Sequence, residues 1–359
     1  MQEDGGKYPF YVRSQNVERI NTFTFDSAGV VTAGDGVGTG KIFHYVCGKF
    51  GLHQRAYLIH NFNNFSARYF YWYFSQNFYD RINQMTAKSS VDSVRKEMIE
   101  KMAILQPPIA EQRAIAEALS DVDGLIAALD KKIAKKRLIK QGAMQQLLTG
   151  KTRLPGFTDE LVDIRFGDYV EIYRGGSPRP IEHYITNQPN GINWIKIGDV
   201  KPRAKYINKT AERIIPEGVS RSRHVQVGDF ILSNSMSFGR PYILGVNGCI
   251  HDGWLVIQNY HQTFDKDYLY YLLCSDDVMS QYIGMAAGSS VKNLNKEKVA
   301  SLSLVIPIDI KEQQAIATIL SDMDKEIAVL EAQRNKYCLL KPGMMQKLLI
   351  GQIRLINTL

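Results

Sequence analysis

The feature that most constrains this chain is a long internal repeat. Residues 111–154 and 312–355 match at about half of their positions: both begin with EQ, continue with LSD, and end with MQQLLTGKTRL or MQKLLIGQIRL. The stretches before the two copies are related more faintly, as TAKSSVDSVRKE and AAGSSVKNLNKE show. The sequence therefore predicts a duplicated unit, in which a variable globular part precedes a repeated helix.

Each copy carries apolar residues at alternating spacings of four and three, which places them on one seam of a helix. The seam residues are Ile115, Leu119, Val122, Ile126, Leu129 and Ile133 in the first copy, and Ile316, Leu320, Met323, Ile327 and Leu330 in the second. A helix of about 40 residues would be roughly 60 Å long. We expect the two helices to pack as an antiparallel coiled coil that separates the globular parts. Two amphipathic helices lying on separate cores are the other interpretation.

Prolines and glycines mark the expected limits of these helices. Pro107 and Pro108 precede the first helix, as a corner between a strand-like run and the helix. Gly142 and Pro342 fall at nearly matching places and are expected to bend or break each helix before its last turns.

The predicted fold class is α+β, with two mixed α/β globular domains and two long helices. The predicted parts are residues 1–105, a helix over 106–156, a second domain over 157–308 and a second helix over 309–359. The second domain alternates short strand-like runs with turns and then a helix over 266–284. The aromatic run ARYFYWYFSQNFYD in the first domain has helical spacing and is expected to lie in the core.

Composition limits the class of partner. The net charge is +8 and the pI is near 9.1, which favours a polyanion, because Lys and Arg gain affinity by releasing counterions from phosphates. The four cysteines are scattered and show no metal-ligand spacing. Without a signal-like start or an apolar run of about 20 residues, the sequence predicts a cytoplasmic protein with no membrane association.

Three segments resemble catalytic motifs but lack the required residues. QPPI has neither the acidic or amide side chain nor the aromatic ring of an adenine methyltransferase loop. GDGVGTGK has the wrong glycine spacing for a phosphate loop and is expected to be a hairpin turn. No Pro-Asp dipeptide introduces a nuclease site, and His251 beside Asp252 has no nucleophile elbow. A chain without its own active site, metal or cofactor is expected.

Loops rich in Arg, Ser, Asn and Gly are the candidates for contact with a nucleic acid. They include YRGGSPRP, SNSMSFGRP and GSSVKNLN in the second domain. Such side chains can bond phosphates and base edges, with Arg bidentate to guanine and Asn to adenine. Solvated turns are the alternative interpretation of each loop.

Two variable parts, each followed by a helix that starts with EQ and ends with MQQLLTGK-RL, resemble the specificity subunits of type I restriction-modification enzymes. Glu111, Gln112, Glu312 and Gln313 stand at the helix-start motif of that family. FGDYV, GGSP, WIKIGDV and residues 288–295 fit its target-recognition domain.

The resemblance implies a non-catalytic subunit that recognises a bipartite double-stranded DNA target. Each recognition domain would take one half-site, and half-sites one helical turn apart would lie roughly 34 Å from one another. The helices would act as the ruler and would dock two modification subunits, which carry S-adenosylmethionine and methylate adenine N6. Motor and nuclease subunits would join for restriction, in a prokaryotic cytoplasm.

The candidate DNA contacts are Arg13, Ser14, Gln15, Lys41, Lys88 and Ser90 in the first domain, and Arg174, Ser177, Arg179, Lys196, Ser233, Asn234, Arg240, Ser290, Lys292 and Asn293 in the second. The candidate partner contacts are Ile115, Leu119, Ile126, Leu129, Ile316, Leu320, Ile327 and Leu330, which could equally serve only the seam between the helices.

The first domain departs from the family pattern. About 30 residues that open the second domain, from Phe166 to roughly Asn190, have no counterpart in the first, where KYPFYVRSQ corresponds to NWIKIGDVK. The first domain is therefore expected to be truncated. Two further hypotheses remain: a defective subunit that binds modification subunits without full DNA recognition, and a self-sufficient methyltransferase or nuclease.

Overall fold

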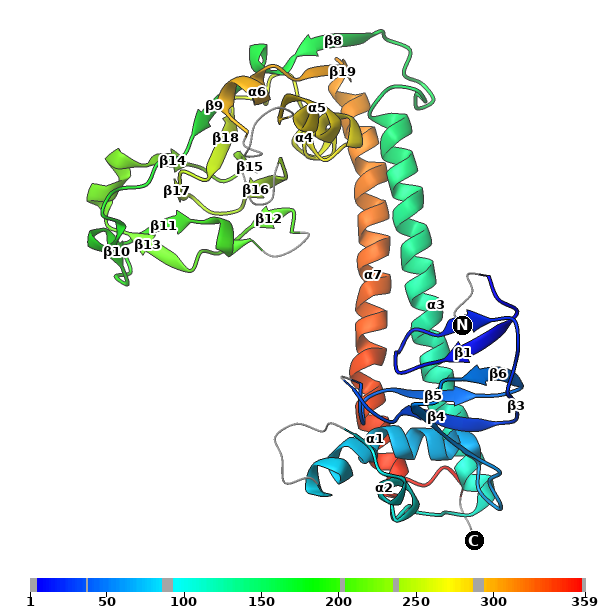
Figure 1. Ribbon diagram of the computed structural model, residues 1–359. Coiled ribbons are helices and arrows are strands. Elements are labelled where there is room, and N and C mark those ends of the chain that lie inside the picture. The colour runs from blue at the N-terminus through cyan, green and yellow to red at the C-terminus, as the bar shows by residue number, and fades with distance from the viewer. Residues whose placement is uncertain are drawn as a thin grey trace. The chain divides into compact units, whose positions relative to one another are not determined.

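The computed structural model describes residues 5–36, 38–85, 93–200, 204–234, 239–286 and 294–356. Two compact units make up the chain: unit 1 is Met1–Ile133 with Leu330–Leu359, and unit 2 is Ala134–Val329. The division passes through both long helices, so that each helix contributes residues to both units (Figure 1). The domain boundaries given by the sequence stay predictions.

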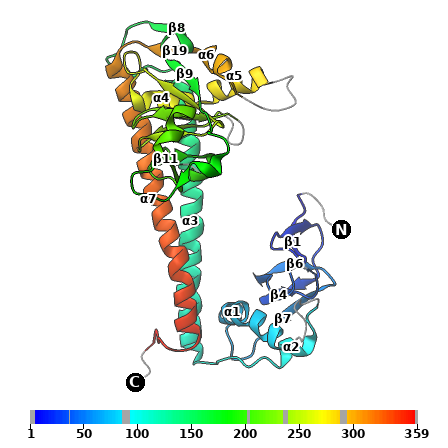
Figure 2. The same cartoon turned by 90° about the vertical axis from the view of Figure 1, so that its left-hand side faces the viewer.

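The two repeats form the long helices α3 (Ile109–Leu147) and α7 (Ile310–Leu349). Their ion pairs run in opposite numerical order, from Asp123–Lys341 and Asp130–Arg334 in unit 1 to Lys136–Glu326 and Lys140–Asp324 in unit 2. Figures 1 and 2 both show the two helices side by side. The predicted antiparallel pairing is confirmed.

Most of the predicted seam is buried. Ile115, Leu119, Leu129, Ile316, Leu320, Ile327 and Leu330 are each at most 8% exposed, and Ile126 is half-buried. Neither Gly142 nor Pro342 ends its helix, since α3 and α7 continue through them. The prediction of a break at these residues is therefore wrong.

The glutamine of each EQ motif joins the start of its long helix to neighbouring backbone segments by hydrogen bonds. Gln313 is fully buried, and its Oε1 accepts the Asp265 N–H at 2.8 Å, while Nε2 donates to the carbonyls of Thr263 and Pro307 at 2.9 Å each. Gln112 does the same in unit 1, with the Ser66 N–H and the Pro107 carbonyl. A glutamine is required there because the side chain must both accept and donate.

Unit 2 contains two five-stranded sheets and one pair of strands in its described residues. The sheet orders are β10-β13-β11-β17-β14, β12-β16-β15-β18-β9 and β19-β8. The strands are β8 (Leu161–Arg165), β9 (Glu171–Arg174), β10 (Ile185–Thr186), β11 (Ile192–Ile195), β12 (Tyr206–Ile207), β13 (Glu212–Ile214), β14 (Arg223–Val225), β15 (Phe230–Ser233), β16 (Pro241–Leu244), β17 (Gly248–Ile250), β18 (Trp254–Gln258) and β19 (Ser303–Pro307).

The helices of unit 2 are the short turns η1 (Phe166–Asp168), η2 (Ile181–His183), η3 (Ile197–Asp199) and η4 (Pro216–Arg221), and the helices α4 (Lys266–Leu273), α5 (Asp276–Ala286) and α6 (Lys296–Ala300). Some of them, η1, α4, α5 and α6, contribute to one large apolar core, whereas η2, η3 and η4 pack against two smaller buried clusters. The single helix predicted over 266–284 is interrupted, because Ser275 leaves the helix and its Oγ accepts the Val278 N–H at 3.3 Å. The core continues onto Ile316 and Leu320 of α7.

Unit 1 has a smaller version of the same arrangement. Its described strands form sheets in the orders β2-β1-β6-β3 and β5-β4-β7, and the aromatic run forms a helix with six buried side chains, as predicted. The elements are β1 (Tyr8–Tyr11), β2 (Glu18–Ile20), β3 (Phe25–Asp26), β4 (Gly29–Ala33), β5 (Phe43–Val46), β6 (Lys49–Leu52), β7 (Ala56–His60), α1 (Ala67–Met85) and α2 (Lys96–Glu100). GDGVGTGK lies in the connection of the antiparallel pair β4 and β5, which confirms the hairpin.

The two units share local backbone features but differ at one strand edge. Asn61 after β7 and Asn259 after β18 both have positive φ, at 60° and 57°. β18 pairs with β15 on one side and β9 on the other, whereas β7 pairs with β4 alone among the described strands. One edge of β7 thus lacks the partner strand that β18 has.

Candidate functional site

The candidate site is an open cavity of about 900 Å³ in unit 2. It lies between the loop that follows β9, the end of β11 and the turn between β17 and β18. Its polar lining includes Ser177, Arg179, Lys196, Glu212, His251 and Asp252. Three of these, Ser177, Arg179 and Lys196, are candidate DNA contacts predicted from the sequence.

The turn that carries Asp252 is fixed by hydrogen bonds of the His251 backbone and of the His251 ring. The His251 N–H donates to the Ile195 carbonyl at 3.1 Å, and His251 Nδ1 accepts the Gly253 N–H at 2.9 Å. Gly175 lies against this turn, where a Cβ would be 2.1 Å from the His251 carbonyl oxygen. Only glycine fits there, which explains the first residue of GGSP.

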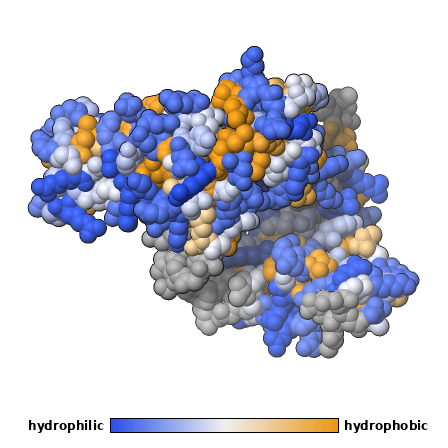
Figure 3. All heavy atoms as spheres, turned by 90° about the horizontal axis from the view of Figure 1, so that it is seen from above, coloured by the Kyte–Doolittle hydropathy of each residue, from blue (hydrophilic) through white to orange (hydrophobic). Residues whose placement is uncertain are grey.

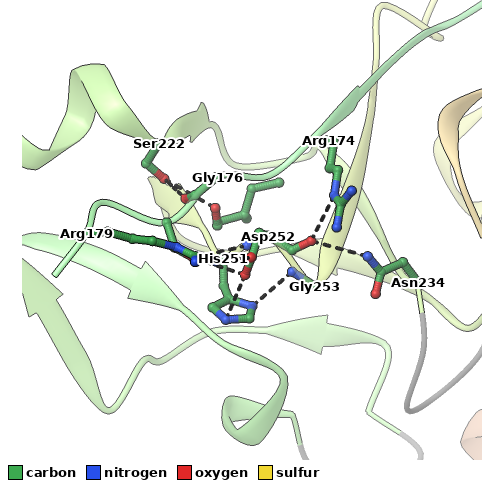
Figure 4. A network of polar contacts seen from close by, with 10 residues as sticks. Arg174, Gly176, Arg179, Ser222, Asn234, His251, Asp252 and Gly253 are labelled. Carbon is green, nitrogen blue, oxygen red and sulfur yellow. Dashed lines mark hydrogen bonds and ion pairs between the residues drawn. The ribbon is translucent and has the colours of Figure 1, made fainter. Parts of the chain in front are cut away.

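Four of the predicted contacts converge on Asp252, and Figure 4 labels three of them, Arg174, Arg179 and Asn234, around it. Its carboxylate accepts hydrogen bonds from Ser177 Oγ at 3.0 Å and Arg179 Nη2 at 3.5 Å. Its main-chain carbonyl accepts from Arg174 Nε at 3.3 Å and Asn234 Nδ2 at 3.2 Å. We call these four residues, with His251 and Asp252, the Asp252 cluster.

The cluster keeps the Asp252 carboxylate ionised. Partial burial alone would raise the pKa of Asp252, but the Ser177 hydroxyl, His251, Arg179 and Arg174 together lower it below its ordinary value. His251 Nε2 lies 2.9 Å from Oδ1 of this carboxylate. At neutral pH the Asp252 carboxylate in the cavity wall is therefore charged and lies among hydrogen-bond donors and cations.

Two predicted contacts need correction. Ser233 and Asn234 are 0% and 5% exposed, and the Asn234 amide is used to hold Asp252. Direct contact of these two side chains with DNA is not supported, because their polar atoms lie inside unit 2. Lys196 forms an ion pair with Glu212, and the Arg240 guanidinium lies 5.4 Å from the centre of the Tyr242 ring.

In unit 1 the predicted contacts lie in different settings. Arg13 forms an ion pair with Asp35 at 2.5 Å, and the Ser14 carbonyl lies 2.9 Å from His44 Nε2. Gln15 lines a cavity of about 400 Å³ with several aromatic side chains, and Lys41 Nζ lies 4.9 Å from the centre of the Tyr79 ring.

The predicted contacts Lys88, Ser90, Ser290, Lys292 and Asn293 lie outside the described residues.

The sequence arguments missed Asp252 and His251 as parts of the site. A signal was present, since GLHQRA in the first domain and CIHDGW in the second place a histidine at the same point. In unit 1, His53 Nδ1 likewise accepts the N–H of Arg55, at 3.1 Å. The repeated histidine marks a turn that occurs in both units. In unit 2 the residue after it, Asp252, accepts the hydrogen bonds of the cluster.

The predicted partner contacts are mostly buried in the seam, so their side chains offer little surface for a second protein. Other apolar residues of the same helices are exposed, namely Leu138, Ile139, Val329, Leu339 and Leu340. Figure 3 also shows hydrophobic residues among hydrophilic ones on the face drawn there. Exposure alone does not identify a docking surface, and the partner contacts stay predictions.

Metal-binding clusters and membrane-spanning helices are both absent from the described part of the chain. No group of three or more His, Cys, Asp or Glu side chains is placed to hold a metal ion. No helix among the described residues has the length and apolar character to span a membrane.

Two known proteins that are similar to this chain are both specificity subunits of type I restriction enzymes. The chain is 23% identical to the type I restriction enzyme MjaVIII specificity subunit of Methanocaldococcus jannaschii, over 77% of this chain and 68% of that protein. It is 30% identical to the EcoDI specificity subunit of Escherichia coli, over 39% of this chain and 30% of that protein.

Solved structures share the fold. The type I restriction-modification S subunit from M. genitalium superposes with a TM-score of 0.63 at 13% identity, covering 97% of this chain and 90% of that one. The HsdS subunit of Thermoanaerobacter tengcongensis gives 0.51 at 15% identity, covering 96% and 84%. A family model, the type I restriction modification DNA specificity domain, matches residues 2–136 and 159–337. The chain therefore belongs to the family of type I restriction-modification specificity subunits, with two specificity domains.

Proposed function

We propose that this chain recognises a bipartite DNA target, with one half-site for each unit, and has no catalytic activity of its own. The observation that carries the proposal is the Asp252 cavity, where Arg179, Ser177 and Lys196 line one open surface of unit 2. Arginine and serine side chains on such a surface can bond base edges and phosphates. The net charge of +8 supports a polyanionic ligand.

The long helices serve as the connection between the recognition units in this proposal. α3 and α7 each run from one unit into the other without interruption, and ion pairs join them within both units. Exposed apolar residues on these helices, such as Leu138 and Leu339, at 68% and 81% exposure, offer surface for two modification subunits. Those subunits would hold S-adenosylmethionine and methylate adenine N6, and motor and nuclease subunits would add restriction.

The test is methylation mapping. The chain is expressed with its modification subunit in a host that lacks DNA methyltransferases, and methylated adenines are mapped across the genome. The proposal expects a split motif with two defined halves and a fixed spacer. A continuous motif, or methylation by the purified chain alone, would contradict it.

One outcome distinguishes the defective-subunit alternative. A stable complex with the modification subunit that methylates nothing would favour a chain that binds its partner without recognising DNA. A motif with one defined half would place recognition in unit 2 alone, where the Asp252 cluster lies.

A further inference from the structure

Asp252 joins segments of unit 2 that are far apart in the sequence. Arg174 ends β9, Ser177 and Arg179 lie in the loop that follows it, and Asn234 follows β15, yet all four donate to Asp252. The contacts to the end of β9 and to the loop after it span 73 to 78 residues of sequence. One residue thus sets the positions of several candidate contacts.

The charge of Asp252 excludes a simple role in holding the DNA backbone. A carboxylate is repelled by phosphate, and a lone one in a DNA-binding cavity would weaken affinity. Here the side chain is turned toward protein donors: Oδ1 accepts from Ser177 and lies 2.9 Å from His251 Nε2, and Oδ2 lies 3.5 Å from Arg179. Two of its hydrogen-bond partners, Ser177 and Arg179, are predicted DNA contacts.

Arg179 is the cluster member that most needs a positioning partner. Its side chain is 82% exposed, against 32% for Asp252. Recognition of guanine by arginine depends on a fixed guanidinium plane that meets O6 and N7 together. A flexible arginine loses rotamer entropy when it binds, and a partner that holds it beforehand reduces that loss.

Unit 1 has the same turn with a different residue. His53 corresponds to His251, since each donates its N–H to the strand β1 or β11 and each Nδ1 accepts an N–H two residues later. The position of Asp252 is then occupied by Gln54, which is exposed. The turn is common to both units, whereas the chemistry at its second residue is not.

We propose that Asp252 is a specificity-determining positioning residue of unit 2, which orients Arg179, Ser177 and Arg174 so that they distinguish bases in one half-site. This inference rests on the proposed function, because it presumes that unit 2 recognises one half of a bipartite target. It predicts that sequence discrimination depends on a carboxylate that does not itself contact phosphate.

The experiment compares methylation motifs of complexes that contain the full chain. Asp252→Asn keeps the size of the side chain but removes the charge that holds Arg179. We expect discrimination at one or more bases of a single half-site to fall about tenfold, with the other half-site and the spacer unchanged. Asp168→Asn, an exposed carboxylate of the same unit, makes the same change of charge and should leave the motif unaltered.

A double substitution separates positioning from a general structural effect. If Asp252 acts through Arg179, then Asp252→Asn should relax the motif much less in an Arg179→Ala background than in the wild type. Independent, additive losses would overturn the proposal. If Asp252→Asn fails to assemble, Asp252→Glu, which keeps the charge but moves the carboxylate by one methylene group, must relax the same half-site, and an unchanged motif would overturn the proposal.

The outcomes also separate this inference from the proposed function. A wild-type complex without a split motif refutes the proposed function. A wild-type split motif that Asp252→Asn leaves unchanged refutes only the role of Asp252.

Discussion

Arg153 and Glu312 form two parallel hydrogen bonds, with Arg153 Nε and Nη2 each 2.7 Å from a different carboxylate oxygen of Glu312. The Glu312 side chain is 1% exposed and that of Arg153 is 25% exposed. In unit 1, Arg354 and Glu111 make the equivalent pair, at 3.3 Å. The arginine of each helix-end motif therefore neutralises the buried glutamate of the other copy's helix-start motif.

Arg153→Leu should destabilise unit 2, because it leaves the buried Glu312 carboxylate without the guanidinium that pairs with it. We expect the midpoint of thermal unfolding to fall by about 5 °C or more. Lys151→Leu removes a charge two residues away, on an exposed side chain, and should change the midpoint little. Equal midpoints for both variants would show that the ion pair contributes no stability.

Gln313→Glu should be far more harmful than the same change at the next residue. A carboxylate at position 313 could not donate to the carbonyls of Thr263 and Pro307. The two carbonyl oxygens would then lie against a carboxylate oxygen with no hydrogen bond between them. A loss of about 3 kcal/mol in the free energy of unfolding is expected. Gln314→Glu, on the exposed face of α7, is the matched control. Denaturant titration of both variants checks this, and similar midpoints would contradict it.

Glu111 should make the free energy of unfolding depend on pH. Burial alone would raise the pKa of Glu111, but the N–H groups of Leu355 and Ile356 and the Arg354 guanidinium lower it below the ordinary 4.5. A folded-state pKa below the unfolded value stabilises the folded state above the unfolded pKa, and that stabilisation is lost as pH falls through the folded pKa.

The difference in stability between wild type and Glu111→Gln should therefore be constant at neutral pH and shrink below about pH 4.5. Thermal melts from pH 7 to about pH 3 measure it. A difference that stays the same down to the lowest pH would contradict the assigned pKa shift.

The open edge of β7 should be visible in amide exchange. The Gly34 N–H donates to the Arg55 carbonyl, and alternation along an antiparallel ladder then turns the Leu58 N–H away from β4. Val256, at the equivalent place in β18, faces Tyr173 of β9. We expect the Leu58 amide to exchange at least about 100-fold faster than that of Val256. Equal protection would mean that another segment covers the β7 edge.

Arg240→Ala should weaken binding to the cognate DNA more than to random DNA, if Arg240 contacts a base. We expect a loss of about 1–3 kcal/mol for the cognate sequence. Arg165→Ala in β8 removes the same charge elsewhere in unit 2. Competition binding at one salt concentration measures both, and equal losses on both DNAs would assign Arg240 to phosphate.

The repeated helices could be predicted because their information is local and is written twice. Apolar spacing fixed the seam residues Ile115 and Leu119, and the EQ motif marked the helix starts. The break predicted at Gly142 and Pro342 is wrong, because packing between the two long helices outweighs the low helix propensity of these residues.

The Asp252 cluster could be predicted only in part. Arg174, Ser177 and Arg179 stood out by residue type, but their common partner lies more than 70 residues away in sequence. Polar composition also could not tell Asn234, which is buried, from a loop residue open to solvent. Register across strands was another limit: the β1–β6 and β11–β17 pairings make Phe10 equivalent to Trp194, two residues from the match that KYPFYVRSQ suggested.

The carboxylate of Glu111 also bears on the order in which the protein is completed during synthesis. Its backbone donor Leu355 lies 244 residues further along the chain. Unit 2, Ala134–Val329, is continuous in sequence and is translated entirely before that donor. The part of the protein that is translated first is thus the last to receive all of its contacts, and in the nascent chain the Glu111 carboxylate has to stay hydrated until residues 354–356 have been made.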